Sequence, residues 1–285
     1  MPADPLRLPH PLTGQAFGSP VPPGTGWPDD PADGATPVAT APADVPGLAA
    51  DAADLAELDA RVSVCRACPR LVGWREDVAV MKRRAFADQP YWGRPIAGWG
   101  DPGAWLLVVG LAPAAHGGNR TGRVFTGDRS GDWIFAALHR AGFAALPTSD
   151  AAGDGQALHG VRIAAAVRCA PPANRPEPAE RDTCAPWLDR EVTLLEPGLR
   201  AVLALGAFAY AAALASARRL GWTAPAPPPR FGHGVVAPLV TTSGRPLPLV
   251  ASYHVSQQNT FTGRLTQAML DGVLVQVREH ARLPA

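Results

Sequence analysis

Short apolar runs alternate with longer amphipathic segments over the last two thirds of this chain. Four runs are short and almost continuously apolar, as buried parallel strands tend to be, and they span residues 104–109, 161–167, 201–205 and 247–251. Segments with helical character occur at residues 132–141, 179–195, 207–218 and 265–282. This alternation predicts a three-layer α/β/α sandwich with a short central parallel sheet, built as a single domain.

Three local features add to this pattern. An alanine-rich helix is expected at residues 52–67, before the first strand. Pro186 lies inside the second predicted helix and should mark a kink or a boundary there, because proline lacks the backbone N–H that a helix uses. The stretch APAPPP at residues 224–229 is expected to form a rigid loop rather than a domain boundary.

The N-terminal region differs from the rest of the chain in composition. Residues 1–57 hold 12 of the 32 prolines, one basic and eight acidic residues, and almost no aliphatic pattern. Such a segment buries too little apolar surface to offset the loss of chain entropy. We therefore expect residues 1–57 to be a disordered Pro/Ala-rich acidic tail, and residues 58–285 to form the folded domain.

The net charge of the predicted folded domain differs from that of the whole chain. The whole chain carries +1, whereas residues 58–285 hold 25 basic and 17 acidic residues, a net charge of +8. This surplus is compatible with a polyanionic partner, although ordinary solvated surface charge is the alternative. The basic residues Lys82, Arg83 and Arg84, with Arg66, Arg70 and Arg75 upstream, are a candidate phosphate-facing patch.

The segment 110–128, GLAPAAHGGNRTGRVFTGD, follows the first predicted strand and precedes a predicted helix. A glycine-rich loop that leaves a buried strand lets backbone N–H groups approach a ligand closely. Many such turns bind nothing, but this one concentrates a histidine, an asparagine, two arginines, an aspartate and a lone phenylalanine. That density favours an active-site loop at the carboxyl edge of the sheet.

The chain has four cysteines, Cys65, Cys68, Cys169 and Cys184. Four thiolates suit tetrahedral zinc or an iron–sulfur cluster, and the spacing does not separate the two. Two disulfides are a third reading, but nothing in the chain points to an oxidising compartment. We expect neither a secretory signal nor a membrane span, and hence a cytoplasmic protein.

Three blocks of sequence resemble the family 5 (type B) uracil-DNA glycosylases. Residues 110–128 are similar to motif 1 of that family, and residues 254–266, HVSQQNTFTGRLT, are similar to its third motif. Residues 168–176, RCAPPANRP, carry a cysteine and an asparagine in the family's order. The blocks occur in the right sequence over residues 62–283, together with the four cysteines.

The resemblance implies a DNA repair enzyme that flips uracil out of DNA and hydrolyses its N-glycosidic bond, leaving an abasic site. It implies a [4Fe–4S] cluster on the four cysteines in place of zinc, with a structural role. The cluster would tie the helical region before Cys68 to the loop between Cys169 and Cys184. The implied partner is DNA containing uracil or deaminated bases, acted on by a monomer associated with the nucleoid.

The same resemblance, combined with side-chain chemistry, suggests how the base is bound. Phe125 is the candidate for stacking on the extruded base, although a lone phenylalanine is by default a core residue. The Asn174 amide has a donor and an acceptor that match the edge of a uracil-like base, and a turn-forming role is its alternative. Ala112 and Ala114 contribute small side chains to the mouth of the pocket and backbone N–H groups beside it.

Two residues are expected to act in catalysis. His254 follows a buried strand and can donate a hydrogen bond to the base carbonyl oxygen where negative charge accumulates; a buried core histidine is the alternative. Asp128 is the carboxylate of motif 1 and can orient water and stabilise the sugar cation, whereas an N-cap role would belong equally to Ser130 or Asp132.

The mouth of the expected pocket departs from the wider superfamily. Many relatives carry an acid or amide just after motif 1 begins, where this chain has Leu111–Ala114 without a polar side chain. A roomy pocket should accept hypoxanthine and modified pyrimidines besides uracil. Residues of the third motif, Ser256, Gln257, Gln258 and Asn259, are expected to enter the duplex and replace the flipped base.

Two other functions compete with this reading. A family 4 uracil-DNA glycosylase shares the fold and cluster, but usually has an acidic residue at the position of Leu111 and a glycine near Ala114. A noncatalytic iron–sulfur or zinc DNA-binding module would have no need of the loop at residues 110–128.

Overall fold

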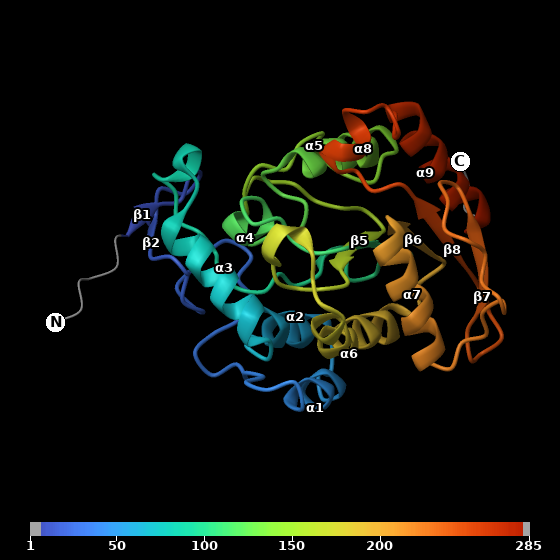
Figure 1. Cartoon of the computed structure of the whole chain (residues 1–285), viewed down its shortest axis with the longest axis horizontal. Coiled ribbons are helices and arrows are strands. Elements are labelled where there is room, and N and C mark those ends of the chain that lie inside the picture. The colour runs from blue at the N-terminus through green and yellow to red at the C-terminus, as the bar shows by residue number, and fades with distance from the viewer. Residues whose placement is uncertain (1–6, 282–285) are drawn as a thin grey trace.

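The computed structural model describes residues 7–281, in which a six-stranded sheet lies between two layers of helices (Figure 1). The strand order is β3-β5-β4-β6-β8-β7. The four central strands are parallel and correspond to the four predicted apolar runs. They are β4 (Leu106–Gly110), β5 (Val161–Ala165), β6 (Ala201–Leu205) and β8 (Pro246–Ser252). Their nearly complete burial is why these runs lack the alternation of a half-exposed strand.

The sheet is mixed rather than purely parallel, because two antiparallel strands close its edges. They are β3 (Trp99–Gly100), beside β5, and β7 (Val236–Val240), beside β8. In β7 buried and exposed positions alternate, and Pro238 is exposed. The nonpolar run VVAPLV at residues 235–240 contains this proline, which argues against a central strand but is tolerated in an edge strand.

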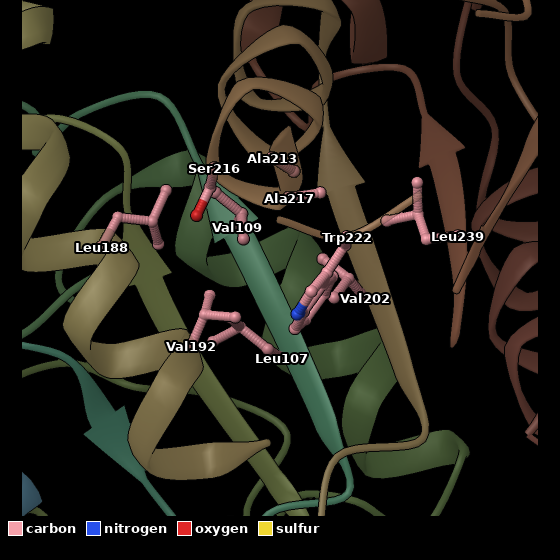
Figure 2. Close-up of a pocket in the computed structure, with 10 residues that line it drawn as sticks. All are labelled: Leu107, Val109, Leu188, Val192, Val202, Ala213, Ser216, Ala217, Trp222 and Leu239. Carbon is pink, nitrogen blue, oxygen red and sulfur yellow. The ribbon is translucent and has the colours of Figure 1, made fainter. Parts of the chain in front are cut away.

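The helices cover both faces of the sheet, which confirms the three layers. On one face α5 (Arg129–Arg140) and α9 (Gln267–His280) pack on β4 residues Leu106 and Val108. On the other face α6 (Pro178–Leu195) and α7 (Ala207–Arg219) pack on Leu107 and Val109. Figure 2 shows this second layer, where Leu188 and Val192 of α6 and Trp222 surround a cavity of only about 10 Å³.

Helix α6 continues past Pro186, where the sequence predicted a kink or a boundary. It begins with Pro178, and Glu177 and Glu180 form a reciprocal capping box at its start. Trp187 and Leu188, directly after Pro186, are 1% and 2% exposed. Packing of these side chains holds the helix together across the hydrogen bond that proline removes.

The prediction that residues 1–57 are disordered is wrong for residues 7–57. Phe17, Val21 and Trp27 are 1%, 0% and 4% exposed and belong to the same apolar cluster as Trp92 and Ile96. The segment forms β1 (Leu8–Pro9), β2 (Ala16–Phe17) and α1 (Asp44–Ala50). Its apolar residues are single anchors separated by prolines, so they follow no helical or strand period although each finds a partner in the domain.

The remaining elements connect this N-terminal segment to the sheet. The predicted alanine-rich helix forms as α2 (Leu55–Ser63), and α3 (Pro69–Met81) follows it without having been predicted. Short elements complete the chain: η1 (Arg84–Phe86), α4 (Gly118–Thr121), η2 (Pro172–Asn174) and α8 (Gln257–Thr260). Within residues 7–281 no helix combines the length and apolar character needed to cross a membrane.

Candidate active site and cysteine cavity

Glycines at the ends of β4 and β6 leave space for the side chains of Phe125 and His254. A Cβ atom on Gly110, the last residue of β4, would lie 2.9 Å from the ring of Phe125. A Cβ atom on Gly206, which follows β6, would lie 3.1 Å from Cβ of His254. A side chain on Gly110 would displace the Phe125 ring, and one on Gly206 would press on Cβ of His254. The Phe125 and His254 rings lie 6.3 Å apart at the carboxyl edge of the sheet.

Phe125 has a backbone conformation that is rare for an aromatic residue. Its φ angle is +51°, in the left-handed region, and its carbonyl group packs against Gly131 of α5. The ring is partly exposed and rests against the main apolar core. Strain of this kind persists where surrounding contacts hold it, and it is concentrated at functional sites. The geometry fits a ring positioned for stacking rather than an ordinary core phenylalanine.

A cavity of about 640 Å³ brings together side chains from all three motif blocks. Ala114 and Asp128 come from the first block, Asn174 from the second and Gln257 from the third. These residues are far apart in sequence, and they meet because the loops that carry them follow β4, β5 and β8 at the same edge of the sheet. The lining of this cavity does not include Phe125 or His254, whose rings lie near each other at the same edge of the sheet.

Asp128 is both the N-cap of α5 and part of the cavity wall. Its Oδ1 atom accepts hydrogen bonds from the backbone N–H groups of Ser130 (2.9 Å) and Gly131 (3.0 Å). Helix α5 starts at Arg129, so neither Ser130 nor Asp132 takes the capping role that the sequence offered them. Burial raises the pKa of Asp128, and the two backbone hydrogen bonds oppose that shift.

His254 is held in its neutral form by its surroundings. Burial lowers the pKa of the imidazole to about 4. Its backbone carbonyl accepts a hydrogen bond from the Asn259 amide at 2.8 Å, which ties the third-motif segment back to the end of β8. A neutral imidazole can donate one hydrogen bond to a ligand without bringing a full charge into the site.

Asn174 is exposed at the rim of the cavity, in the turn that follows Pro171. Ala173 and Asn174 both have positive φ angles, +51° and +55°, so the turn presents the side chain in a fixed direction. Ala112 lies deeper and packs with Cys68, Cys169 and Leu71 rather than at the cavity mouth. The structure therefore separates Ala112, which links the loop to the cysteines, from Ala114, which lines the cavity.

The residues of the third-motif segment also differ in whether they line the cavity. Gln257 and Gln258 are exposed at the start of α8, and of the four predicted residues Gln257 alone lines the cavity. Ser256 is the N-cap residue, and its carbonyl oxygen accepts hydrogen bonds from the next turn. Asn259 is turned inward by its bond to His254. Phe261, which sequence reasoning did not single out, is 65% exposed beside Arg129, with 5.8 Å between guanidinium and ring.

Sequence reasoning assigned no individual role to four residues of the cavity wall, Phe86, Gln89, His116 and Arg120. Arg120 donates hydrogen bonds to Gln89 Oε1 (2.7 Å) and to the Gly127 carbonyl (2.9 Å), and its guanidinium lies 4.0 Å from the Phe86 ring centroid. His116 Nδ1 lies 3.1 Å from the Tyr91 hydroxyl. The unusual density of polar residues in segment 110–128 was the available signal for His116 and Arg120.

The predicted basic patch is only partly formed. Arg83 and Arg84 are exposed, and Arg83 lines the cavity. Arg66 pairs with Glu76, and Arg70 pairs with Glu177 and Glu180. Arg75 is 1% exposed and faces the cysteines instead of solvent. The upstream arginines are therefore structural.

All four cysteines line one small, mainly apolar cavity between α3 and α6. They are free thiols, which excludes the reading of two disulfides in this structure. Burial raises the pKa of Cys65 to about 11 and that of Cys68 to about 12, with the neighbouring Cys169 adding to both shifts. Within residues 7–281 no three His, Cys, Asp or Glu side chains gather closely enough for a single metal ion.

Two buried arginines surround the cysteine cavity. Arg75 Nη1 donates hydrogen bonds to Cys169 Sγ (2.9 Å) and the Cys65 carbonyl (3.1 Å), and the Arg168 backbone N–H donates to Cys184 Sγ (3.3 Å). Nε of Arg75, and Nε and Nη1 of Arg168, are buried without an acceptor in the described part of the chain. Unpaired cationic donors beside four thiols fit an anionic group bound between them.

Comparisons with known proteins agree with this geometry. A family model described as the uracil DNA glycosylase superfamily matches residues 97–278. The type-5 uracil-DNA glycosylase of Mycobacterium bovis is 58% identical over 272 residues, which cover 95% of this chain and 98% of that protein. The proteins of the same name from Thermus thermophilus and Pyrobaculum aerophilum are 50% and 46% identical, over 78% and 75% of this chain and 96% and 88% of their own lengths.

Proposed function

Because this chain belongs to the uracil-DNA glycosylase superfamily, with type-5 enzymes as its relatives, we propose that its 640 Å³ cavity is the active site. The chain is a DNA repair glycosylase that excises uracil from DNA. The observation that carries the proposal is the meeting of Asp128, Asn174 and Gln257 in one cavity at the carboxyl edge of the sheet. Neither alternative, a family 4 enzyme or a noncatalytic binding module, is favoured by these relatives.

Extrusion of the base is the first problem that the site must solve. Removing a base from the stack costs a few kcal/mol, which contacts inside the pocket and a residue inserted into the duplex must recover. Phe125, held rigidly by its backbone, offers a face for the base to stack on. Asn174 offers an amide to the edge of the base, and the exposed Gln257 and Gln258 are placed to fill the vacated position in the duplex.

Cleavage of the N-glycosidic bond then separates two charges. The sugar becomes cationic, and the carboxylate of Asp128, with Oδ2 free of the capping bonds, stabilises it and orients the attacking water. The departing base becomes anionic, and neutral His254 donates a hydrogen bond to its carbonyl oxygen. The site thus places an anion beside the developing cation and a neutral donor beside the developing anion.

Single-turnover base release tests this assignment. Asp128→Asn and His254→Ala should each slow uracil excision by roughly a hundred- to thousandfold, the usual effect of losing one transition-state contact, while DNA affinity changes little. Asp132→Asn, a carboxylate one turn further along α5 that also lines the cavity, is the matched control and should retain activity. Near wild-type rates in both test variants would place the chemistry elsewhere.

The volume of the cavity determines which bases it can accept. With small alanines at its mouth and a volume of about 640 Å³, the pocket has space for hypoxanthine and modified pyrimidines besides uracil. A panel of duplexes carrying these bases measures their relative release. Hypoxanthine release at less than a thousandth of the uracil rate would argue for a narrow pocket.

We further propose that Cys65, Cys68, Cys169 and Cys184 hold a [4Fe–4S] cluster with a structural role. The support is that all four cysteines line one cavity and that Arg75 donates a hydrogen bond to Cys169. In addition, Nε of Arg75 and Nε and Nη1 of Arg168 are buried donors without an acceptor in the described part of the chain. In a [4Fe–4S] cluster each of the four cysteine sulfurs binds a different iron, so the cysteines lie further apart than around a single zinc ion. When bound, the cluster would link α3, α6 and the turn that carries Asn174.

Metal analysis of anaerobically purified protein tests the cluster. We expect a brown protein with about four irons per chain. Cys184→Ala should lose the iron, lower the melting temperature and reduce activity through the turn that carries Asn174. Stoichiometric zinc without iron would overturn the proposal.

We propose that the enzyme works as a monomer on chromosomal DNA in the nucleoid. The support is that Asp128, Asn174 and Gln257 meet in a cavity formed within a single chain. Sedimentation of the protein with and without a uracil duplex tests the stoichiometry, and one chain per lesion is the expected result.

A further inference from the structure

The turn between β1 and β2 reaches the wall of the active-site cavity. Pro11 and Leu12 line the same cavity as Asp128 and Asn174, and Leu12 is 52% exposed. In Figure 1 this hairpin is drawn at the left of the view, near the N-terminus, and in the sequence it lies far from the third motif. A segment without any motif of the family therefore contributes part of the surface that faces the substrate.

The tip of this hairpin is held rigidly by a buried histidine. His10 is 1% exposed, and its Nδ1 atom accepts hydrogen bonds from the backbone N–H groups of Leu12 (3.3 Å) and Thr13 (3.4 Å). The turn is closed by bonds from His10 N to the Gln15 carbonyl (2.8 Å) and from Gly14 N to the His10 carbonyl (3.0 Å). Leu12 is thus presented in one position, which lowers the entropy cost of a contact made by it.

The hairpin is also attached to the motif loop itself. The rings of His10 and Trp27 meet edge to face with their centroids 4.7 Å apart. Trp27 Nε1 donates a hydrogen bond to the carbonyl of Thr121, within segment 110–128, at 3.3 Å. Val21 N donates to the Trp92 carbonyl at 3.0 Å. These contacts set the position of Leu12 relative to the loop that carries Asp128.

The chemistry around Leu12 suits a DNA strand. The same cavity wall includes the exposed cation Arg83 and the ring of Phe86. An extruded nucleotide stays covalently linked to its neighbours, so the strand must cross the mouth of the cavity that receives the base. Phosphates favour the guanidinium, whereas the deoxyribose and the adjacent base offer apolar surface to a leucine.

We propose that Leu12 contacts the damaged DNA strand beside the extruded nucleotide, with a neighbouring phosphate on Arg83. The inference rests on the proposed active site and adds an N-terminal contact to it. Leu12 contributes through apolar area, independently of salt, whereas the contribution of Arg83 depends on counterion release. The N-terminal segment is then part of the DNA-binding surface of the enzyme.

Binding to a duplex that carries a non-hydrolysable 2′-fluoro-deoxyuridine tests the contact. Leu12→Ala should weaken binding about five- to tenfold, since alanine retains only part of the apolar area that leucine would bury against the strand. Leu12→Met should retain wild-type affinity. The melting temperature should not change, because Leu12 is half exposed in the free protein.

Salt dependence and a matched variant separate this contact from a general charge effect. The loss in Leu12→Ala should be the same at low and high salt, whereas Arg83→Ala should reduce the salt slope by about one. Val38→Asp, in the same segment and 41% exposed outside the cavity, should leave affinity unchanged, and Leu12→Asp should reduce it further than Leu12→Ala.

Different results would overturn the Leu12 contact and the proposed active site. Affinity of Leu12→Ala within twofold of wild type, or equal losses in Leu12→Asp and Val38→Asp, would overturn the Leu12 contact. Retained activity in Asp128→Asn and His254→Ala would instead remove the active site on which it rests.

Discussion

Gly110 and Gly206 place the two rings of the site because neither carries a Cβ atom. The Phe125 ring occupies the space above the end of β4, and His254 occupies the space beside the residue that follows β6. Asp128 adds a carboxylate whose capping bonds use Oδ1. In the proposed site, burial raises the pKa of Asp128 and lowers the pKa of His254.

The pH dependence of single-turnover excision follows from those two pKa shifts. Burial raises the pKa of Asp128, so its active anion is lost, and the rate falls, as the pH decreases through a value above the ordinary 3.8. His254 stays neutral down to about pH 4, so no limb should occur near its ordinary pKa of 6.5. In Asp128→Asn any remaining acid limb should lie near pH 4, where His254 becomes protonated. A limb near 6.5 that disappears in His254→Ala would contradict this account.

The same shift makes a prediction for stability. With a folded pKa of about 4 and an unfolded value near 6.5, His254 binds its proton more readily in the unfolded state. The free energy of unfolding should therefore fall as the pH drops from 6.5 to 4, by up to about 3 kcal/mol from this group. Denaturant titrations of wild type and His254→Phe across this range measure the difference, which should shrink in the variant.

Individual elements bring the site and the cysteine cavity together. Helix α3 carries Arg75, whose side chain bonds Cys169 and whose carbonyl accepts a hydrogen bond from the Asn119 amide (3.1 Å) in segment 110–128. Ala112 of the same segment packs against Cys68 and Cys169. The helix that sequence reasoning overlooked is thus the link between the proposed cluster and the active-site loop.

Arg75→Leu tests this link. The substitution removes the donor to Cys169 and the buried positive charge, so we expect lower iron retention under oxygen and a melting temperature several degrees below wild type. Arg75→Lys, which keeps the charge but not the planar fork, should be intermediate. Arg66→Leu, on an exposed residue paired with Glu76, is the control and should behave like wild type. Equal iron retention in Arg75→Leu would show that the arginine has no part in holding the group.

At the scale of the whole molecule, the N-terminal segment is part of the folded unit. Phe17, Val21 and Trp27 are buried, and Asp30 pairs with Arg94, whose guanidinium lies 3.9 Å from the centroid of the Trp92 ring. Each such apolar side chain contributes about 1.5–3 kcal/mol, so three of them approach the total stability of a typical domain.

Deletion of residues 1–36 should therefore destabilise the enzyme strongly. The expected result is a melting temperature at least ten degrees lower, or insoluble protein, because the Trp92 side of the core loses its cover. Trp27→Ala should give part of the effect, and Val38→Ala, on an exposed residue, should give none. Unchanged thermal unfolding of the truncated protein would show that the segment is dispensable.

The sequence alone determined the features that depend on local pattern. Continuous apolar runs identified the four parallel strands, since strands buried on both faces have no solvent-exposed positions. Periodic segments identified α5, α6, α7 and α9, and the polar density of segment 110–128 marked the site. The sequence did not predict the edge strands or α3, because these elements are only partly buried and their apolar patterns are short or mixed.

Only the tertiary structure decided the features that depend on contact between distant residues. Prolines and acidic residues made residues 1–57 look disordered, yet Phe17 and Trp27 are buried against Trp92 and the motif loop. Arg75 looked like a surface cation and lies beside Cys169 instead. Single anchors of this kind carry no periodicity, because the surface that buries each of them belongs to another part of the chain.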